Sequence, residues 1–286
     1  MMNSKKQLVN KFVDIEELIL SKNPKLHRRM PRFILNYLKN TIHEEEINSF
    51  MNRHQDKQGV DFCDAVIEEF NIQIEVVGVE NIPREGGVIF VANHPLGGMD
   101  ALAIVSALRG VRDDIKFIVN DLLLKVNNLK GLFVGVNKHG KNAADSLRNV
   151  DELFASDHAV FIFPAGLVSR KLNGKIRDLE WKKTFISRSK KYQKPVVPVF
   201  VDGKLSYFFY LLSIWRKRLG IKANIEMFFL SNETFKQKNK KITLIFGEPI
   251  NHAYFDNSKS DQEWANEVKE IVYKIDDHYK KRKSTK

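Results

Sequence analysis

The stretch that decides the fold is Val88–Ile104, which reads VIFVANHPLGGMDALAI. Its first residues form a continuous apolar run, typical of a strand that is covered on both faces. The run ends at Asn93–His94, a turn with two glycines follows, and we expect a helix to begin near Asp100. Ligands of open α/β sheets gather at such carboxyl ends of strands. The segment therefore predicts a buried strand with a site at its end.

Short β-rich runs alternate with helical stretches from residue 72 onward. The runs are IQIEVVG (72–78), GVIFVAN (87–93), KFIVN (116–120), LFVGV (132–136), AVFIF (159–163), VVPVFV (196–201) and ITLIFG (242–247). We expect helices between them over 100–108, 142–155 and 181–191, and a last one over 261–281. This alternation predicts an α/β fold, with a mostly parallel central sheet flanked by helices.

The first 70 residues show helical spacing of apolar residues, interrupted by Pro24 and Pro31. We therefore expect an N-terminal helical region over 1–70 and a second domain over 71–286. A basic cluster lies between and just after the two prolines, either as a solvated turn or as a contact for lipid headgroups. Its members are Lys25, His27, Arg28, Arg29 and Arg32.

Composition excludes several classes of protein. Apolar residues make up 43% of the 286 residues, which is enough for a sizeable core. The one cysteine, Cys63, excludes an intramolecular disulfide and a Cys-based zinc site, and suits a packed or partly exposed thiol in a reducing cytoplasm. The first twenty residues lack the apolar core of a secretory signal. The most apolar stretch, Tyr207–Trp215, is about half of what a bilayer span needs. We expect a soluble or peripheral protein.

The net charge of +12 is concentrated in one window. Residues 165–222 contain fifteen Lys and Arg but three acidic residues, an excess that equals the net charge of the whole chain. A localised basic field predicts an anionic partner: nucleic acid, an anionic membrane surface or a phosphorylated substrate.

Two strand ends carry side chains that suit catalysis or ligand binding. His94 and Asp100 suit a pair in which the carboxylate fixes the imidazole tautomer and the free nitrogen takes a proton. The structural alternative is a helix N-cap for Asp100 and no catalytic role for His94. The second end, VFIFPAGLVSRK over 160–171, combines loop amides with Arg170 and Lys171, which suits a phosphate, although strand-Pro-Gly turns are common.

Other chemistries find little support. The sequence contains no G-x-S-x-G elbow, no H-E-x-x-H and no clustered His and carboxylate motif, so neither that type of serine hydrolase nor a metal site is expected. Residues 135–142 resemble a phosphate-binding loop, but Asn142 replaces the Ser or Thr that holds magnesium, so nucleotide binding is not favoured.

Four ordered blocks carry a resemblance to a known family. They are NHP with Asp100, FPxG at 163–166, VPVF at 197–200 and GEPI at 247–250. Over about residues 75–250 the chain resembles the glycerolipid, or lysophospholipid, acyltransferase family. NHPLGG is most similar to a bacterial branch often labelled haemolysin-like, which includes O-acyltransferases that complete aminolipids.

The resemblance implies roles residue by residue. His94 matches the catalytic base, Asp100 its acidic partner, Pro164 and Gly166 the substrate-binding turn, and Pro198 the fourth block. The acceptor hydroxyl, deprotonated by His94, then attacks an acyl thioester directly, and the family needs no metal or cofactor besides the acyl carrier protein or coenzyme A thioester. Amides near Gly97 and Gly98, or in the 164–167 loop, are expected to stabilise the oxyanion, with Asn93 beside the site.

Three departures from the family pattern bear on the substrate. Five residues separate His94 from Asp100 where the family usually has four, and we expect the two glycines to absorb the extra one. In the third block Ala165 replaces a Glu, and the Arg expected soon after Gly166 is absent, with Arg170 as the nearest one. An Arg of the second block is replaced by Asn137-Lys138. Lys138, Arg170 and Lys171 remain as candidates for the headgroup. Fewer fixed arginines favour, slightly, an aminolipid over lysophosphatidate as acceptor.

The sequence thus predicts an O-acyltransferase of membrane lipid and phospholipid metabolism that acylates the hydroxyl of a lyso-lipid. We expect it on the inner face of the cytoplasmic membrane, held by anionic lipids through the basic window and by an interfacial or packed helix at Tyr207–Trp215. The alternative is a non-catalytic basic protein of the same fold that binds lipid or nucleic acid; an acyltransferase needs no nucleic acid.

Overall fold

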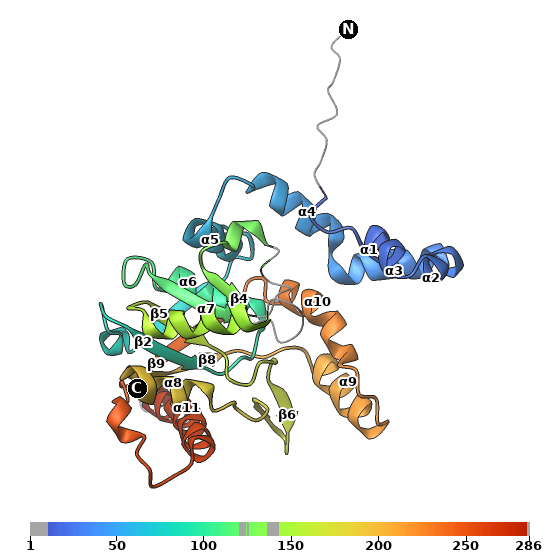
Figure 1. The fold of residues 1–286 in the computed structure, drawn as a ribbon. Helices are drawn as coiled ribbons and strands as arrows, with labels where there is room; N and C mark the ends of the chain where they lie inside the picture. Colours follow the sequence, from blue (N-terminus) through green and yellow to red (C-terminus); the bar gives the residue numbers. More distant parts are fainter. Residues whose placement is uncertain (1–10, 120–123, 125, 136–142, 285–286) are drawn as a thin grey trace.

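The computed structural model describes residues 11–119, 124, 126–135 and 143–284, and within them a seven-stranded sheet forms the centre of the molecule (Figure 1). Its strands are β1 (Gln73–Val77), β2 (Val88–Ala92), β3 (Ile115–Val119), β4 (Phe133–Gly135), β5 (Ala159–Ile162), β8 (Val196–Asp202) and β9 (Lys241–Phe246). Their spatial order is β1-β9-β8-β2-β5-β3-β4. All seven predicted strands are present, and the predicted fold class is confirmed.

Strand direction divides the sheet into two parts. Strands β8, β2, β5, β3 and β4 run parallel, as predicted. Strand β9 pairs antiparallel with β8, and β1 pairs parallel with β9, so these two strands run the other way. The carboxyl ends of β2, β5 and β8 therefore meet the start of β9 at one edge of the sheet.

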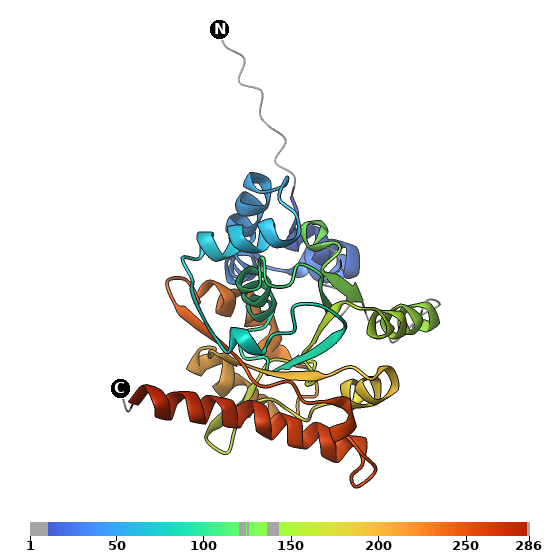
Figure 2. The same ribbon diagram turned by 90° about the vertical axis from the view of Figure 1, so that its left-hand side faces the viewer.

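Helices cover both faces of the sheet (Figures 1 and 2). One face packs against α5 (Gly59–Glu69) and α6 (Gly98–Ala107). The other packs against α7 (Ala143–Ala155), α8 (Thr184–Tyr192) and α11 (Asp261–Ser284), the long red helix of Figure 2. Alternate residues of β2 enter the two cores, which explains its unbroken apolar run.

Four helices precede α5 and form the N-terminal extension: α1 (Ile15–Lys22), α2 (Pro24–Arg29), α3 (Arg32–Ile42) and α4 (Glu44–Arg53). Pro24 is the first residue of α2, and Pro31 directly precedes α3, positions that suit proline. Helix α5, in contrast, lies in the main core, where burial raises the pKa of the Cys63 thiol to about 12. The division into an N-terminal helical region over 1–70 and a second domain over 71–286 stays a prediction.

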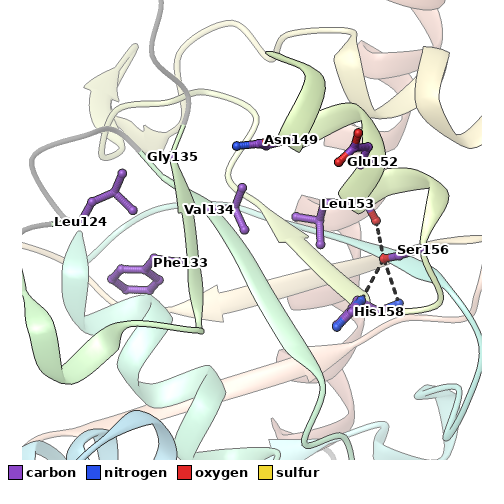
Figure 3. A pocket seen from close by; sticks show the side chains of 9 residues that line it. All are labelled: Leu124, Phe133, Val134, Gly135, Asn149, Glu152, Leu153, Ser156 and His158. Carbon is purple, nitrogen blue, oxygen red and sulfur yellow. Dashed lines mark hydrogen bonds between the residues drawn. The ribbon is translucent and has the colours of Figure 1, made fainter. Parts of the chain in front are cut away.

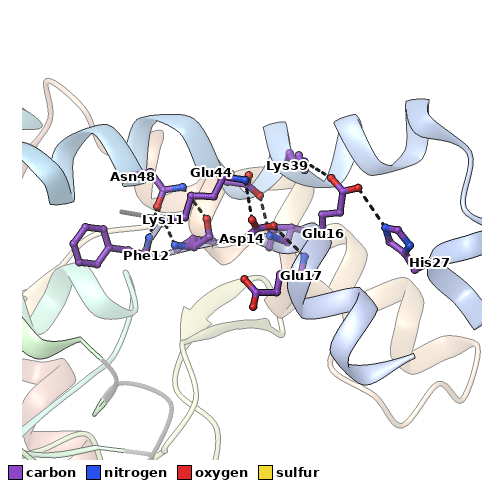
Figure 4. Close-up of polar contacts among 11 residues, drawn as sticks. Lys11, Phe12, Asp14, Glu16, Glu17, His27, Lys39, Glu44 and Asn48 are labelled. Atoms are coloured by element: carbon purple, nitrogen blue, oxygen red, sulfur yellow. Dashed lines mark hydrogen bonds and ion pairs between the residues drawn. The ribbon is translucent and has the colours of Figure 1, made fainter. Parts of the chain in front are cut away.

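Buried polar side chains of α4 hold the segment before α1 (Figure 4). The backbone N–H groups of Phe12 and Val13 donate to Asn48 Oδ1 at 2.8 and 2.9 Å, and the N–H of Ile15 donates to Glu44 Oε2 at 2.9 Å. These donors precede or begin α1 and lack helical partners, so the α4 side chains satisfy them. The first helix is thereby fixed on the fourth.

The remaining elements lie between β5 and β9 or join the sheet strands. They are the hairpin β6 (Arg170–Leu172) and β7 (Lys175–Arg177), the helices α9 (Tyr207–Arg218) and α10 (Leu230–Phe235), and the short helices η1 (Val79–Asn81), η3 (Asn127–Leu129), η4 (Ile225–Phe229) and η5 (His252–Tyr254). Helix α10 contacts the N-terminal extension: Ser231 Oγ donates to the Ile42 carbonyl at 2.7 Å, and the His43 ring stacks on Phe235. Figure 1 shows α9 and α1–α3 projecting from the same side of the sheet.

Within the described parts of the chain, no helix combines the length and the apolar character needed to cross a bilayer.

Candidate active site

His94 and Asp100 meet at the carboxyl end of β2. His94 Nδ1 lies 2.9 Å from Asp100 Oδ2. An ionised carboxylate can only accept a hydrogen bond, so Nδ1 carries the proton and Nε2 is the nitrogen left to take another. The arrangement can therefore act as a general base whose ring is held by a carboxylate.

The glycine turn accommodates the extra residue between His94 and Asp100. Gly97 adopts φ +70° and ψ −135°, a conformation that side chains rarely adopt, and α6 begins at the next residue. A β-carbon on Gly97 would also lie 3.2 Å from Leu230 and 3.3 Å from Val168. Asp100 sits inside the first turn of α6, where Oδ2 also accepts the Leu96 N–H at 2.9 Å. The N-cap is Gly97, so the capping interpretation of Asp100 was wrong.

The Asp100 carboxyl is fully buried, and its second oxygen, Oδ1, has no hydrogen-bond partner. Burial raises the pKa of this carboxyl above its ordinary value, while the hydrogen bond and charge of His94 act in the opposite direction. A half-satisfied buried carboxylate is costly unless a cation forms beside it. Protonation of His94 would supply that cation.

The His94 ring remains accessible, with 18% of the side chain exposed. Its other support is aromatic: the ring stacks on Phe163 at 4.1 Å between centroids and 22° between planes. Phe163 follows β5 directly, so two neighbouring strand ends hold one imidazole. The sequence reasoning assigned no such role to Phe163, although it quoted the residue within the FPxG block.

The loop after β5 brings Pro164 and Gly166 close to this site. The N–H of Gly166 donates to the Phe163 carbonyl at 2.9 Å, and Gly166 has φ +66°. A β-carbon there would lie 3.1 Å from Lys182 Nζ. The N–H of Lys182 also donates to the Pro164 carbonyl at 3.1 Å. Lys182 is thus a cation beside the predicted substrate-binding turn that sequence reasoning did not select.

Arg170 differs from its predicted position at the headgroup. Its side chain is 2% exposed and donates to Glu226 Oε1 at 3.0 Å and to the Val168 carbonyl at 2.5 Å. Glu226 also pairs with Arg216 Nε at 2.8 Å. Burial lowers the pKa of Arg170, and the Glu226 charge opposes that shift. The guanidinium is therefore used inside the protein, in a buried Arg–Glu–Arg group.

The other predicted substrate residues fall in three places. Lys171 is half-buried, with Nζ 5.4 Å from the Tyr207 ring at the start of α9. Asn93 is buried and joins β2 to β8, donating to the Val201 carbonyl at 2.9 Å and accepting the Val201 N–H at 2.7 Å. It supports the site from behind. Lys138 lies outside the described residues, as does most of the phosphate-loop-like segment 135–142.

A family model described as Acyltransferase matches residues 17–280. The chain belongs to this acyltransferase family. It is 47% identical over 265 residues to a protein of Bacteroides thetaiotaomicron named Lyso-glycine lipid O-acyltransferase, covering 92% of this chain and 97% of that one. A protein of the same name from Phocaeicola vulgatus is 41% identical, covering 92% and 95%. The resemblance inferred from the four blocks is confirmed, and the non-catalytic alternative is not carried further.

The fold is also similar to a solved structure, the 1-acyl-sn-glycerophosphate (LPA) acyltransferase PlsC from Thermotoga maritima. The TM-score is 0.51 at 18% sequence identity, over 92% of this acyltransferase and 95% of PlsC. This likeness supports the fold alone.

A pocket of about 500 Å³ opens at the same sheet edge as the His94 turn of this acyltransferase. Asn93, Pro95 and Leu96 form part of its wall. Because β9 runs antiparallel to β8, Lys240 and Lys241 at its start reach this edge, and the pocket is lined by them. Lys204 and Lys280 complete a basic rim of four lysines, beside the carboxylates of Asp202 and Asp276. Lys280 pairs with Asp276 at 2.6 Å, and Lys241 pairs with Glu75 at 3.0 Å.

A second pocket, also about 500 Å³, lies along β4 and α7 (Figure 3). It holds a serine and a histidine, with Ser156 Oγ 2.8 Å from His158 Nδ1. The hydroxyl, however, donates to the Leu153 carbonyl at 2.8 Å, which makes it a cap at the end of α7. Neither His94 nor Asp100 lines either of the two pockets.

In the described part of the chain, no group of three or more His, Cys, Asp or Glu side chains is placed to hold a metal ion.

Proposed function

We propose that this acyltransferase moves a fatty acyl group from a thioester to the hydroxyl of a lyso-lipid, with His94 as general base. The 2.9 Å contact between His94 Nδ1 and Asp100 Oδ2 carries the proposal, because it leaves Nε2 on a partly exposed ring as the proton acceptor. Asp100 steadies the imidazolium that forms.

The reaction follows from ordinary acyl-transfer chemistry. Nε2 takes the hydroxyl proton as the acceptor oxygen bonds to the thioester carbonyl carbon. The tetrahedral intermediate collapses, the carbon–sulfur bond breaks, and the departing sulfur takes the proton back from Nε2. Backbone amides of the Gly97–Gly98 turn or of the loop at Gly166 are the proposed donors to the oxyanion.

The acceptor we propose is a single-chain aminolipid, of the kind named for the two bacterial relatives. A phosphomonoester is best held by fixed arginine forks. Arg170, which sequence reasoning offered as a replacement for the family's arginine, is 2% exposed and bound to Glu226. The cations near the loop, Lys182 and Lys171, are point charges that suit a single carboxylate.

The proposed donor is an acyl thioester of acyl carrier protein or coenzyme A. Both carry phosphate on the pantetheine arm, and the basic rim of Lys204, Lys240, Lys241 and Lys280 lies at the sheet edge that holds His94. A positive field at this edge attracts such a donor and, for the carrier protein, its acidic surface.

We propose peripheral attachment to the inner face of the cytoplasmic membrane. Large apolar side chains are exposed on α2, α3 and α9, which project from one side in Figure 1. They are Leu26, Phe33, Ile34, Tyr37, Tyr207, Phe208 and Trp215. Arg28, Arg29 and Arg32 accompany them on α2 and α3, and the exposed Lys217 and Arg218 lie in the last turn of α9. Apolar burial together with basic contacts to anionic lipid is the usual mode of interfacial binding.

A competition assay tests the reaction and the acceptor together. Purified enzyme receives an acyl thioester, lysophosphatidate and an N-(3-hydroxyacyl)glycine whose hydroxyl is free. We expect the glycine lipid to be acylated with the higher kcat/KM. A tenfold preference for lysophosphatidate would contradict the proposed acceptor, and acylation of neither by folded enzyme would contradict the proposed reaction.

Vesicle flotation tests the membrane face. We expect binding to anionic vesicles that weakens with salt, since exposed charge contacts are screened over about 8–10 Å at moderate ionic strength. Phe33→Ser and Trp215→Ser should weaken binding further, whereas Leu147→Ser, equally exposed but on α7, should not. Equal loss in all three variants would contradict the proposed face.

A further inference from the structure

A second buried carboxylate, that of Asp178, contacts the His94 backbone. It is fully buried and follows the β6–β7 hairpin directly. Asp178 Oδ1 accepts the backbone N–H of His94 at 3.2 Å and the Ser169 hydroxyl at 2.6 Å. Its other oxygen accepts the Trp181 indole N–H at 2.8 Å. This carboxylate therefore accepts three donors, one of which is the His94 backbone N–H.

The His94 backbone needs this carboxylate because the sheet has ended. Strand β2 pairs with β8 as far as Ala92 and with β5 as far as Val91. The His94 N–H lies beyond both ladders, and a buried amide without a partner is costly. A charged acceptor on a backbone N–H makes a stronger hydrogen bond than a neutral one.

The contacts close a ring around the His94 peptide. Its carbonyl accepts the Ser169 N–H at 2.8 Å, while the Ser169 hydroxyl and the His94 N–H share Asp178 Oδ1. Asp178 itself is fixed from α11: its N–H donates to Tyr273 Oη at 2.7 Å, and its carbonyl accepts from Lys269 Nζ at 2.9 Å.

We propose that Asp178 is a positioning residue that fixes the His94 backbone, and through it the imidazole, for proton transfer. Asp100 and Phe163 orient the imidazole ring, but neither holds the His94 backbone, which would be free to shift without Asp178. Geometry errors of about 1 Å can cost on the order of 10²-fold in rate. Asp178 also contributes, after burial, to raising the pKa of the Asp100 carboxyl.

This inference rests on the proposed role of His94, and the test separates the two. Asp178→Asn keeps the size of the side chain but removes its charge and one of its two acceptor oxygens, because the amide NH2 only donates. We expect kcat to fall at least tenfold while KM for donor and acceptor stays within twofold, and an unchanged kcat in the folded variant would overturn the role. Trp181→Phe is the matched control, because it breaks a hydrogen bond to the same carboxylate on the oxygen that does not reach His94. It should lower the melting temperature with less than a threefold change in kcat.

Further outcomes would overturn the positioning role of Asp178 or contradict the proposed function. A kcat that falls equally in both variants, in proportion to their melting temperatures, would overturn the positioning role. A change confined to KM would also overturn it. If Asp178→Asn does not fold, Asp178→Glu keeps the charge and moves the oxygens by one methylene, and a normal kcat in that variant would be equally decisive against the role. An active His94→Ala variant would instead contradict the proposed function.

Discussion

Asp100 and Arg170 are both buried charged residues that follow neighbouring strands of one sheet, yet their surroundings differ. Asp100 keeps one oxygen without a partner, and burial raises its pKa. Arg170 is bonded to Glu226 and to the Val168 carbonyl, and its Cζ atom lies 5.1 Å from the centroid of the Phe209 ring. The Asp100 carboxylate thus has an acceptor oxygen without a hydrogen bond beside an accessible histidine, whereas the Arg170 guanidinium is hydrogen-bonded and enclosed. This difference predicts a chemical role for the Asp100 carboxylate and a structural role for Arg170.

The comparison predicts opposite consequences of substitution. Changes in the His94–Asp100 pair should lower activity with little loss of stability. Changes in the Arg170–Glu226–Arg216 group should lower stability, with activity following only as folded protein is lost.

The largest effect is expected for His94→Ala. Loss of a general base costs about 10²–10⁴-fold in rate. The ring is partly exposed, so the melting temperature should change little. Single-turnover acyl transfer, with circular dichroism as a check on folding, measures both. Activity within threefold of wild type in folded protein would remove His94 from the mechanism.

Asp100→Asn should lower kcat by about 10²-fold, the lower end of the range for loss of base function, because the ring loses its acceptor and its tautomer. Stability should rise or stay constant. A raised carboxyl pKa means that the folded protein binds the proton more tightly than the unfolded chain does. The stability contribution of Asp100 is therefore greatest at low pH and is lost as pH rises through the raised pKa.

The difference in melting temperature between Asp100→Asn and wild type should accordingly grow as the pH rises above about 4, the ordinary pKa of an aspartate, in favour of the variant. Thermal unfolding across that range, monitored by circular dichroism, provides the measurement. A difference that stays constant with pH would show that the carboxyl titrates alike in both states.

Glu226→Gln should leave the two arginines, Arg170 and Arg216, without their shared carboxylate. Removing one partner of a buried ion pair destabilises a protein by about 3–5 kcal/mol. Urea unfolding measures the free energy, and kcat per folded molecule should remain within a few-fold. A stable variant that has lost kcat would place the group in the chemistry and break the comparison.

The smallest effect is expected when all three charges are removed together. Buried ionic groups replaced by well-packed apolar residues are often neutral or stabilised. Arg170→Met, Glu226→Leu and Arg216→Met combined should therefore recover most of the stability that Glu226→Gln loses. Urea unfolding of this variant beside Glu226→Gln sharpens the assignment. A triple variant less stable than the single one would mean that the three charges have a stabilising role that apolar side chains cannot replace.

The sheet was predictable because several of its strands are apolar runs bounded by polar residues or turns. Val88–Ala92 shows why: every residue is buried, so the sequence has no polar alternation to obscure the pattern. Strand direction was not predictable, because Lys241–Phe246 has the same character whichever way it pairs. The reversal of β9 emerges only from its pairing with β8.

The site was half predictable. His94 and Asp100 stand six positions apart in a turn with two glycines, so local spacing found them. Asp178 is 84 residues from His94, and no local pattern links the two. The sequence did contain a signal for the β6–β7 hairpin that precedes Asp178. Asn173-Gly174, both with positive φ, is the common two-residue turn between antiparallel strands. Its strands are three residues each and lack apolar alternation.

The pairing of β1 with β9 has a consequence for the order of events during synthesis. Thr243 bonds to Glu75 across 168 residues of sequence, and β9 lies between β1 and β8 in the sheet. A nascent chain that ends before Phe246 has therefore made β1 but has no strand to set beside it. Loop closure over such a separation is slow relative to local pairing. The sheet closes only after most of the chain has left the ribosome, and the Lys240–Lys241 edge of the basic pocket arrives with that last strand.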